Sequence, residues 1–120
     1  MDMKLELIAV PVSDVDAAIA FYTSIGFVLD HDVQVSDEMR FVQLTPPGSA
    51  CSIALGVSEM APGTMQGLQV VVDDAEATRD HLRASGYDAP EVQEFPWGRF
   101  TYFEDPDGNG WACQQIVPQG

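Results

Sequence analysis

The feature that most constrains this chain is an internal repeat with a period of sixty residues. The segment VPVSDVDAAIAFYTSIGF at 10–27 aligns without a gap on VVVDDAEATRDHLRASGY at 70–87. Apolar, acidic and glycine positions coincide, as in the pairs Val10 and Val70, Asp14 and Asp74, and Gly26 and Gly86. Agreement of this kind in one register indicates a duplicated supersecondary unit.

Each copy has the pattern of one strand and one helix followed by three more strands. Apolar and β-branched residues predict the first strands at 5–12 and 67–72. Helices are predicted at 14–25 and 74–85, with Ser13 and Asp73 as N-caps and a glycine after each end. The further strands are expected at 27–34, 40–45 and 51–57 in the first copy, and at 87–94, 99–104 and 111–117 in the second.

The copies define the domain organisation. A chain of 120 residues fits a single domain, here 1–120, of the α+β class. The first βαβββ module covers about 4–57 and the second about 67–117. The stretch SEMAPGTMQ at 58–66 has no periodicity and is predicted to be the linker. Neither module buries its helix and sheet alone, so we expect both to pack as one domain.

Charge and cysteine content limit the partners. Nineteen acidic against five basic residues give a net charge of −14, which argues against binding to nucleic acid or anionic membranes. The acidic field favours cationic ligands, although it also serves solubility alone. The chain has no long apolar run and no signal-peptide pattern, so a cytoplasmic location is expected. Cys51 and Cys113 are expected to be reduced thiols, with a disulfide between them as the open alternative.

Two motifs carry a family resemblance. The segments VPVSDVDAAIAFYTSIGF and FTYFEDPDGNGW, together with the repeat, resemble the vicinal oxygen chelate superfamily. This superfamily includes glyoxalase I, extradiol dioxygenases and bleomycin-resistance proteins. The resemblance implies two half-barrels that form a curved mixed sheet around a cleft. It also implies a homodimer in which a partner chain completes the cleft.

The same resemblance implies a divalent metal ion held by His, Glu or Gln from four strands. Carried over to this sequence, the ligand positions are Leu7, Gly67, Ala112 and either Ser52 or Ala54. Zinc, iron and manganese need imidazole, carboxylate or thiolate donors, which these residues lack. We therefore expect no metal and no other cofactor. A metalloenzyme with different ligands is the least favoured of three hypotheses.

If Leu7 and Ala112 stand at the family's ligand positions, strand alternation indicates which residues line the cleft, and the segment EFPWGRFTYF adds aromatic side chains near its mouth. Apolar, amide and aromatic side chains dominate this set, and Arg99 either holds a ligand carboxylate or forms a surface ion pair. Aromatic residues in the set are alternatively core or interface packing. The residues predicted to bind a ligand are Leu7, Ala9, Ala54, Gln69, Trp97, Arg99, Tyr102, Ala112 and Gln114.

These residues favour a binding protein that sequesters a small aromatic or cationic molecule, as bleomycin-resistance relatives do. The alternative is a metal-free isomerase or lyase with a carboxylate as general base, for which Glu6 and Glu104 are candidates. Asp105, in the turn DPDGNG at 105–110, is expected to hydrogen-bond the turn backbone instead.

Overall fold

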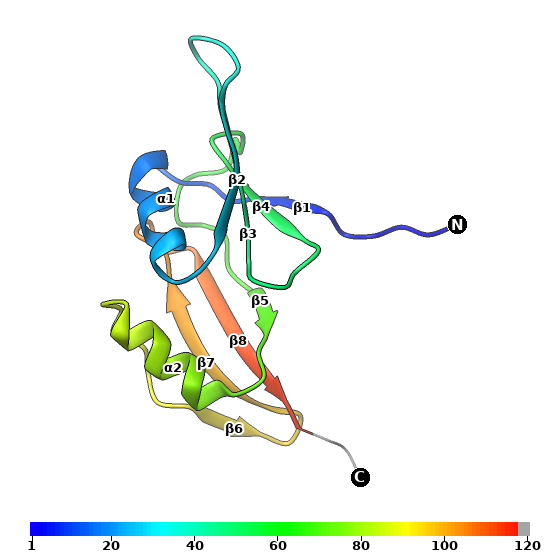
Figure 1. Cartoon of the computed structure of the whole chain (residues 1–120), viewed down its shortest axis with the longest axis vertical. Helices are drawn as coiled ribbons and strands as arrows, with labels where there is room; N and C mark the ends of the chain where they lie inside the picture. Colours follow the sequence, from blue (N-terminus) through cyan, green and yellow to red (C-terminus); the bar gives the residue numbers. More distant parts are fainter. Residues whose placement is uncertain (118–120) are drawn as a thin grey trace. The chain divides into compact units, whose positions relative to one another are not determined.

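The structure, a computed structural model, describes residues 1–117. The chain forms two compact units (Figure 1). Unit 1 comprises residues 1–65 together with the turn at 105–109, and unit 2 comprises residues 66–104 and the strand that follows Asn109. Each unit has the predicted order of one strand, one helix and three strands. The division falls within the stretch predicted as the linker, and the closing turn of the second module belongs to unit 1.

Unit 1 contains a mixed four-stranded sheet, called sheet A here, and one helix. Its strands run in the order β1-β4-β3-β2, with β1 parallel to β4 and the other neighbours antiparallel. The elements are β1 (Leu7–Ala9), α1 (Val15–Ser24), β2 (Val28–Gln34), β3 (Arg40–Thr45) and β4 (Ser52–Leu55).

Unit 2 repeats this arrangement in sheet B. Its strands run in the order β5-β8-β7-β6, again with one parallel pair, β5 and β8. The elements are β5 (Leu68–Val71), α2 (Ala75–Ala84), β6 (Gln93–Phe95), β7 (Gly98–Glu104) and β8 (Gly110–Ile116). The two tandem βαβββ modules and their two mixed sheets confirm the predicted fold class.

The helix starts correct the predicted N-caps by one residue. Asp14 and Asp74, rather than Ser13 and Asp73, have the extended backbone of a cap. Their carboxylates accept the backbone N–H of Ala17 and Ala77, both at 3.0 Å. A cap side chain must reach the amide three residues ahead, and the aspartates stand at that distance. At the other ends, Gly26 and Gly86 have φ values of 112° and 97°, as the predicted helix stops require.

The strand predicted at 87–94 is wrong for most of its length, because β6 covers only 93–95. Pro90 lies in the preceding segment, and a proline cannot donate a backbone hydrogen bond to a strand partner. Instead, Ala89 O accepts Arg83 Nε at 2.9 Å and Pro90 O accepts Thr101 Oγ1 at 3.2 Å. This loop reaches back to the helix and to β7.

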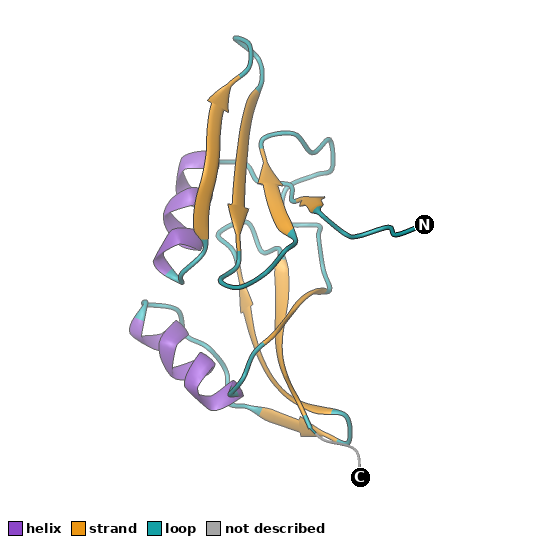
Figure 2. Cartoon of the chain, turned by 45° about the vertical axis from the view of Figure 1, so that its right-hand side comes forward, coloured by secondary structure: helices purple, strands orange, loops and turns teal. Residues whose placement is uncertain are grey.

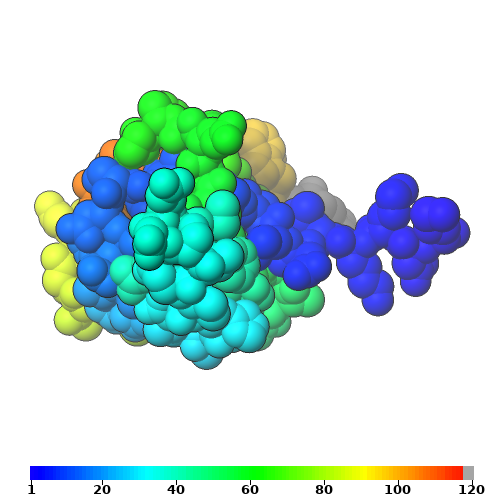
Figure 3. Space-filling view, turned by 90° about the horizontal axis from the view of Figure 1, so that it is seen from above, coloured from blue at the N-terminus to red at the C-terminus, as the bar shows by residue number. Residues whose placement is uncertain are grey.

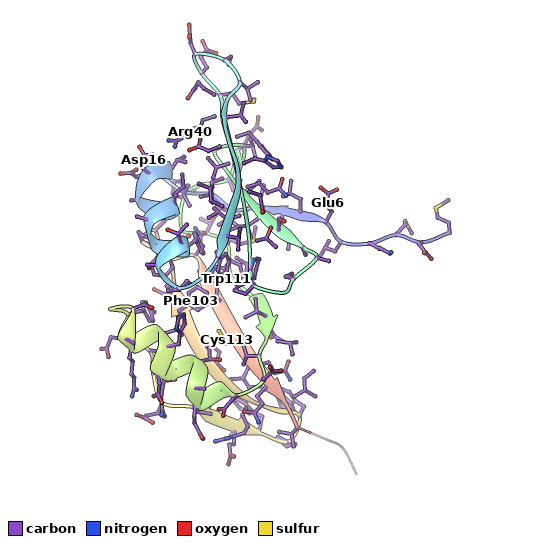
Figure 4. All side chains as sticks on the ribbon, in the orientation of Figure 1. Glu6, Asp16, Arg40, Phe103, Trp111 and Cys113 are labelled. Atoms are coloured by element: carbon purple, nitrogen blue, oxygen red, sulfur yellow. The ribbon has the colours of Figure 1, made fainter. Side chains whose placement is uncertain are left out.

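Each sheet has one face toward its helix and one face away from it (Figure 2). In sheet A, Arg40 of β3 reaches Asp16 of α1 at 2.9 Å, and both residues are labelled in Figure 4. Val42 and Leu44 lie on the same face as Arg40 and are fully buried. In sheet B, Gln115 of β8 accepts the N–H of Ala75, which marks its helix face. The opposite side of each sheet is called the open face below.

The closing turn is bonded into unit 1 through two buried polar residues, Asp105 and Asn109. Asp105 accepts the N–H groups of Asp107 and Asn109, as expected, and also accepts the Tyr22 hydroxyl at 2.8 Å. The Asn109 amide donates to Asp105 Oδ2 and to Pro11 O. The two sequence motifs that carry the family resemblance are therefore joined by direct hydrogen bonds.

Two further observations concern expectations from composition. Cys51 and Cys113 are both free cysteines, so the disulfide alternative is not formed. Over residues 1–117, neither helix has the length and apolar character needed to cross a membrane.

Candidate functional site

The open face of sheet B brings together several of the predicted binding residues. Strand register places Tyr102 opposite Ala112, and Ala112 beside Gln69, in one row across β7, β8 and β5. Gln114 lies in the next row, between Phe100 and Val71. Because side chains alternate along a strand, both rows point away from α2.

Two glutamine amides form a fixed pair on this face. Gln69 Nε2 donates to Gln114 Oε1 at 2.6 Å, and Gln114 Nε2 donates to the backbone carbonyl of Trp97 at 3.3 Å. Gly98 makes this geometry possible, because a Cβ there would lie 2.6 Å from Gln114 Nε2. The pair therefore holds its polar atoms in place at the surface of the sheet.

Four aromatic side chains continue from the amide pair to the β6–β7 turn and are called the aromatic row. Phe95 and Trp97 stack with ring centroids 5.3 Å apart, and Phe95 meets Phe100 edge-on at 5.5 Å. Phe100 and Tyr102 lie nearly parallel at 6.2 Å. Trp97 is 57% exposed and Phe95 39% exposed, whereas Phe100 is buried. Phe95 belongs to the predicted aromatic segment but was not among the residues predicted to bind a ligand, and the pairing of β6 with β7 brings it into the row.

Arg99 does not join this group. It lies on the helix face of sheet B, where its guanidinium is ion-paired with Glu76 of α2 and with Glu94, the latter at 2.9 Å. The hydrogen bond that its guanidinium donates to the Glu76 carboxylate raises the pKa of Arg99 above its ordinary value. Arg99 thus has the ion-pair role weighed in the sequence analysis. Arg40, Arg79 and Arg83 are also ion-paired with acidic side chains.

Leu7, Ala9 and Ala54 lie in unit 1, on the open face of sheet A. Ala9 is the register partner of Ala54, and Gln43 lies opposite Ala54 on β3. Ala54 has no exposed surface, whereas Leu7 is 37% exposed. Only Leu7 and Ala9 of these three therefore present surface to a ligand.

A polar network that sequence analysis missed crosses the open face of sheet A. Gln43 donates to Ser52 Oγ at 3.2 Å, and the hydroxyls of Ser52 and Thr45 are 2.6 Å apart. Thr45 also donates to the Asp30 carboxylate. The alternation in RFVQLT, with Gln43 between two buried residues, was the available signal. These side chains satisfy one another and so differ from the exposed rings of sheet B.

Strand register settles the fourth position of the family's metal site. Gln69, sixty residues after Ala9, pairs with Ala112, while Ala9 itself pairs with Ala54. Ala54 rather than Ser52 is therefore the equivalent of Ala112. Aliphatic side chains have no donor atoms, so these positions cannot bind a divalent ion.

The remaining two positions, Leu7 and Gly67, also lack a side-chain donor. Across residues 1–117, no group of three or more His, Cys, Asp or Glu side chains is placed to hold a metal ion. The residues present thus do not fit the metal ion that the fold family implies.

The carboxylates named as possible general bases are exposed. Glu6 precedes β1 and Glu104 ends β7, and both are open to solvent. Asp105 is the one buried carboxylate of the described chain, and its oxygens accept four hydrogen bonds. The open face of sheet B can therefore bind through stacking and amide hydrogen bonds, without a buried base beside it.

Comparison with known proteins identifies the family. The sequence model of the Glyoxalase/Bleomycin resistance protein/Dioxygenase superfamily matches residues 4–113, so the chain belongs to this superfamily. Among solved structures it is similar to TnmS3, an antibiotic binding protein from Streptomyces sp. CB03234, with 34% identity, 97% and 98% coverage of the two chains, and a TM-score of 0.87.

Two further relatives extend this result. A glyoxalase/bleomycin resistance protein from the same Streptomyces strain is 36% identical, with 93% of this chain and 100% of that chain covered and a TM-score of 0.81. The uncharacterized protein YetH of Bacillus subtilis (strain 168) is 26% identical over 120 residues, which is 96% of this chain and 100% of the relative.

Proposed function

We propose that this protein binds a small planar aromatic molecule on the open face of sheet B, without a metal ion. The observation that carries the proposal is the exposed Phe95–Trp97 stack beside the Gln69–Gln114 amide pair. Apolar and aromatic surfaces with a few fixed polar groups are typical of small-molecule sites. The similar antibiotic binding protein from Streptomyces supports a binding role.

Stacking supplies the affinity in this proposal. An aromatic pair contributes about 0.5–1.5 kcal/mol beyond the burial of its area. Trp97 and Phe95 expose ring surface, whereas Phe100 and Tyr102 support them from within the row. The amide pair supplies orientation, because its atoms are already held by two hydrogen bonds. A planar ligand with one hydrogen-bonding edge matches this surface.

The charge of the protein favours a neutral or cationic ligand. All four arginines are ion-paired with acidic side chains of the chain itself, so none of them is available to hold an anion without losing a pair. The net charge of −14 attracts cations and repels anions. Metal independence rests on the donor set, since alanine, leucine and glycine occupy the family's ligand positions.

The two tryptophans give a direct test. Trp97 is 57% exposed, whereas Trp111 is 5% exposed and stacks on Phe103, so a ligand on the open face should quench Trp97. The probes are proflavine, a planar cation; anthracene-9-carboxylate, a planar anion; and cyclohexylammonium, a cation without a flat ring. We expect saturable quenching by proflavine, weaker quenching by the planar anion and none by cyclohexylammonium.

The controls separate the parts of the proposal. The variant Trp97→Phe should lose the quenching signal but retain heat of binding for proflavine in calorimetry. Binding should be unchanged after treatment with EDTA. Loss of proflavine binding in EDTA would contradict metal independence, and equal binding of cyclohexylammonium would show that charge rather than stacking attracts the ligand.

A further inference from the structure

The two glutamines on the open face of sheet B belong to a longer chain of hydrogen bonds. This chain begins at the backbone carbonyl of Trp97, continues through the Gln114 amide and ends at the Gln69 amide. It is called the amide relay. Gln114 is half-buried, whereas Gln69 is exposed. The relay therefore connects the turn that carries the exposed Trp97 ring to a polar group on the edge strand β5.

The Trp97 carbonyl determines the direction of the relay. A carbonyl oxygen only accepts hydrogen bonds, so Gln114 has to turn its Nε2 atom toward it, at 3.3 Å. The Gln114 Oε1 atom then faces Gln69, which has to turn its own Nε2 atom inward, at 2.6 Å. Turning over either amide alone would place two acceptor oxygens against each other. Gln69 Oε1 is therefore the free end of the relay.

This terminal oxygen is a stronger acceptor than that of an isolated glutamine. Among residues 1–117, no hydrogen bond reaches Gln69 Oε1. Hydrogen bonds in a chain polarise one another, so the last carbonyl of the relay gains negative charge. The second N–H group of Gln69 gains nothing as a donor, because donation through the first N–H makes the amide more electron-rich. The relay therefore ends in an acceptor that requires a donor from the ligand.

The charge of the protein favours the same kind of ligand group. All four arginines are ion-paired, and the one lysine, Lys4, lies on residues 1–6, an extended segment that stands out from the rest of unit 1 (Figure 3). The net charge of −14 creates a negative potential. An N–H or O–H group presents a partly positive hydrogen to this potential and is attracted, whereas a lone pair is repelled.

Strand register gives the distance that a ligand has to span. Gln69 lies on β5, Gln114 lies on β8, and the register partner of Gln114 on β7 is Phe100 of the aromatic row. Neighbouring strands are about 4.8 Å apart, so β5 lies roughly 10 Å from β7, about the length of three linearly fused aromatic rings. A ligand of this length stacks on the row and also reaches Gln69 Oε1.

We propose that the amide relay makes this surface selective for planar aromatic molecules with an N–H or O–H donor at one end, and that Gln69 determines the selectivity. The inference rests on the proposed function, because the rings of the ligand stack on Phe95 and Trp97. The donor of the ligand then bonds Gln69 Oε1. Aromatic amines and amino-substituted heterocycles are the chemical class that fits this arrangement.

Two dyes with the same ring system and the same charge at neutral pH test the selectivity. Proflavine carries an amino group at each end of three fused rings, whereas acridine orange carries dimethylamino groups at the same positions, without N–H. In calorimetric titration we expect proflavine to bind about fivefold more tightly, the factor that one net hydrogen bond supplies. Acridine orange is the more apolar dye, so burial of surface alone would give the opposite order.

The variant Gln69→Met tests whether Gln69 is responsible. Methionine has an unbranched side chain of similar length but no amide, so the preference for proflavine over acridine orange should disappear in this variant. The matched control is Gln43→Met on the open face of sheet A, where Gln43 also donates a side-chain hydrogen bond. This control should keep the fivefold preference of the wild type.

Hydrogen exchange of the side-chain amides, measured by NMR, tests the relay without a ligand. In Gln69→Met, the bonded N–H of Gln114 keeps its acceptor, the Trp97 carbonyl, and should exchange as slowly as in the wild type. In Gln114→Met, the Gln69 amide loses its acceptor and should exchange rapidly. Rapid exchange of the Gln114 amide in Gln69→Met would overturn the direction of the relay.

The binding results distinguish this inference from the proposed function. Equal affinity of the wild type for both dyes, weakened in each case by Trp97→Ala, would overturn the selectivity and leave the proposed function in place. A preference for proflavine that persists in Gln69→Met would overturn the role of Gln69. Failure of both dyes to bind would overturn the proposed function and the selectivity together.

Discussion

Units 1 and 2 have the same elements in the same order, but their open faces differ in chemistry. On sheet A, the side chains of Gln43, Ser52 and Thr45 bond to one another. On sheet B, Phe95 and Trp97 stack at the surface with little to cover them. The repeated plan is thus preserved in the helix starts and the strand register, while the face without a helix has diverged. The proposed binding surface lies on the face of sheet B that has diverged.

The closing turns of the two modules differ in burial, and a substitution in the buried turn at 105–109 should have the largest effect on stability. Asp105→Ala removes the acceptor for Tyr22, Asn109 and two backbone amides in a buried position. Each unsatisfied buried group costs about 1–3 kcal/mol, so we expect a loss of about 3 kcal/mol or more in the free energy of unfolding. Urea denaturation followed by circular dichroism measures this loss.

The matched variant is Ser49→Ala in the corresponding turn of the first module. Ser49 exchanges hydrogen bonds with the backbone of Cys51, and it is exposed. Its loss should cost about 0.5 kcal/mol, as is usual at the surface. Equal costs for Asp105→Ala and Ser49→Ala would show that the turn at 105–109 does not have the structural role described here.

The two open faces should also differ in ligand binding. Trp97→Ala removes half of the exposed stack on sheet B, and we expect about tenfold weaker proflavine binding, since 1.4 kcal/mol corresponds to a factor of ten. Phe41→Ala removes the aromatic ring of β3 on the open face of sheet A. It should leave the affinity within about twofold. Calorimetric titration compares the two variants, and a larger effect at Phe41 would move the site to unit 1.

The fold was predictable from the sequence because the repeated positions include helix ends and strands, which have recognisable local residue patterns. Gly26 and Gly86 mark both helix ends, and alternation placed Gln69 and Ala112, which are register partners, on one face. The predicted N-cap of α1 was wrong by one residue, because serine, here Ser13, is also a favourable N-cap residue. In the structure, its hydroxyl instead donates to Asp107 at 2.6 Å. Contacts between residues far apart in the chain decided this, and they are not visible in local patterns.

The site was predictable only in part for the same reason. Gln69 and Gln114 were named from alternation, but their mutual hydrogen bond depends on parallel pairing of β5 with β8. Arg99 was predicted to meet a ligand because aromatic residues are its neighbours in the sequence. Alternation places it on the opposite face from Tyr102, and Glu76 of α2 then holds it. The position of the helix, rather than sequence proximity, determined the role of Arg99.

Each unit contains one cysteine, and the buried one, Cys113 of unit 2, should make the free energy of unfolding depend on pH. Burial raises the pKa of the Cys113 thiol from its ordinary 9.0 to about 12. In the unfolded chain this thiol ionises near its ordinary pKa. The contribution of the buried neutral thiol to the free energy of unfolding is therefore fully present below pH 9, and it is lost as the pH rises toward 12. At pH 10 the loss should be roughly 1 kcal/mol.

Unfolding free energies at pH 8 and pH 10 measure this difference. Cys113→Ala should lose about 1 kcal/mol less than the wild type over this interval. Thiol labelling of the native protein gives an independent check. Cys51 is half-buried and should react first, while Cys113 is 1% exposed and should react only on unfolding. Equal labelling rates would contradict the burial of Cys113.

The smallest expected difference lies at the two helix starts, where the repeat is most faithful. Asp14 and Asp74 accept the N–H three residues ahead with the same distance, 3.0 Å, so Asp14→Ala and Asp74→Ala should each cost about 1 kcal/mol. Urea denaturation should find these costs within about 0.5 kcal/mol of each other. Asp73→Ala, which removes the neighbouring acid but leaves the cap, is the control and should cost less. A marked difference between the costs of Asp14→Ala and Asp74→Ala would contradict this expectation. It would mean that the surrounding unit alters how much the same hydrogen bond contributes to the free energy of unfolding.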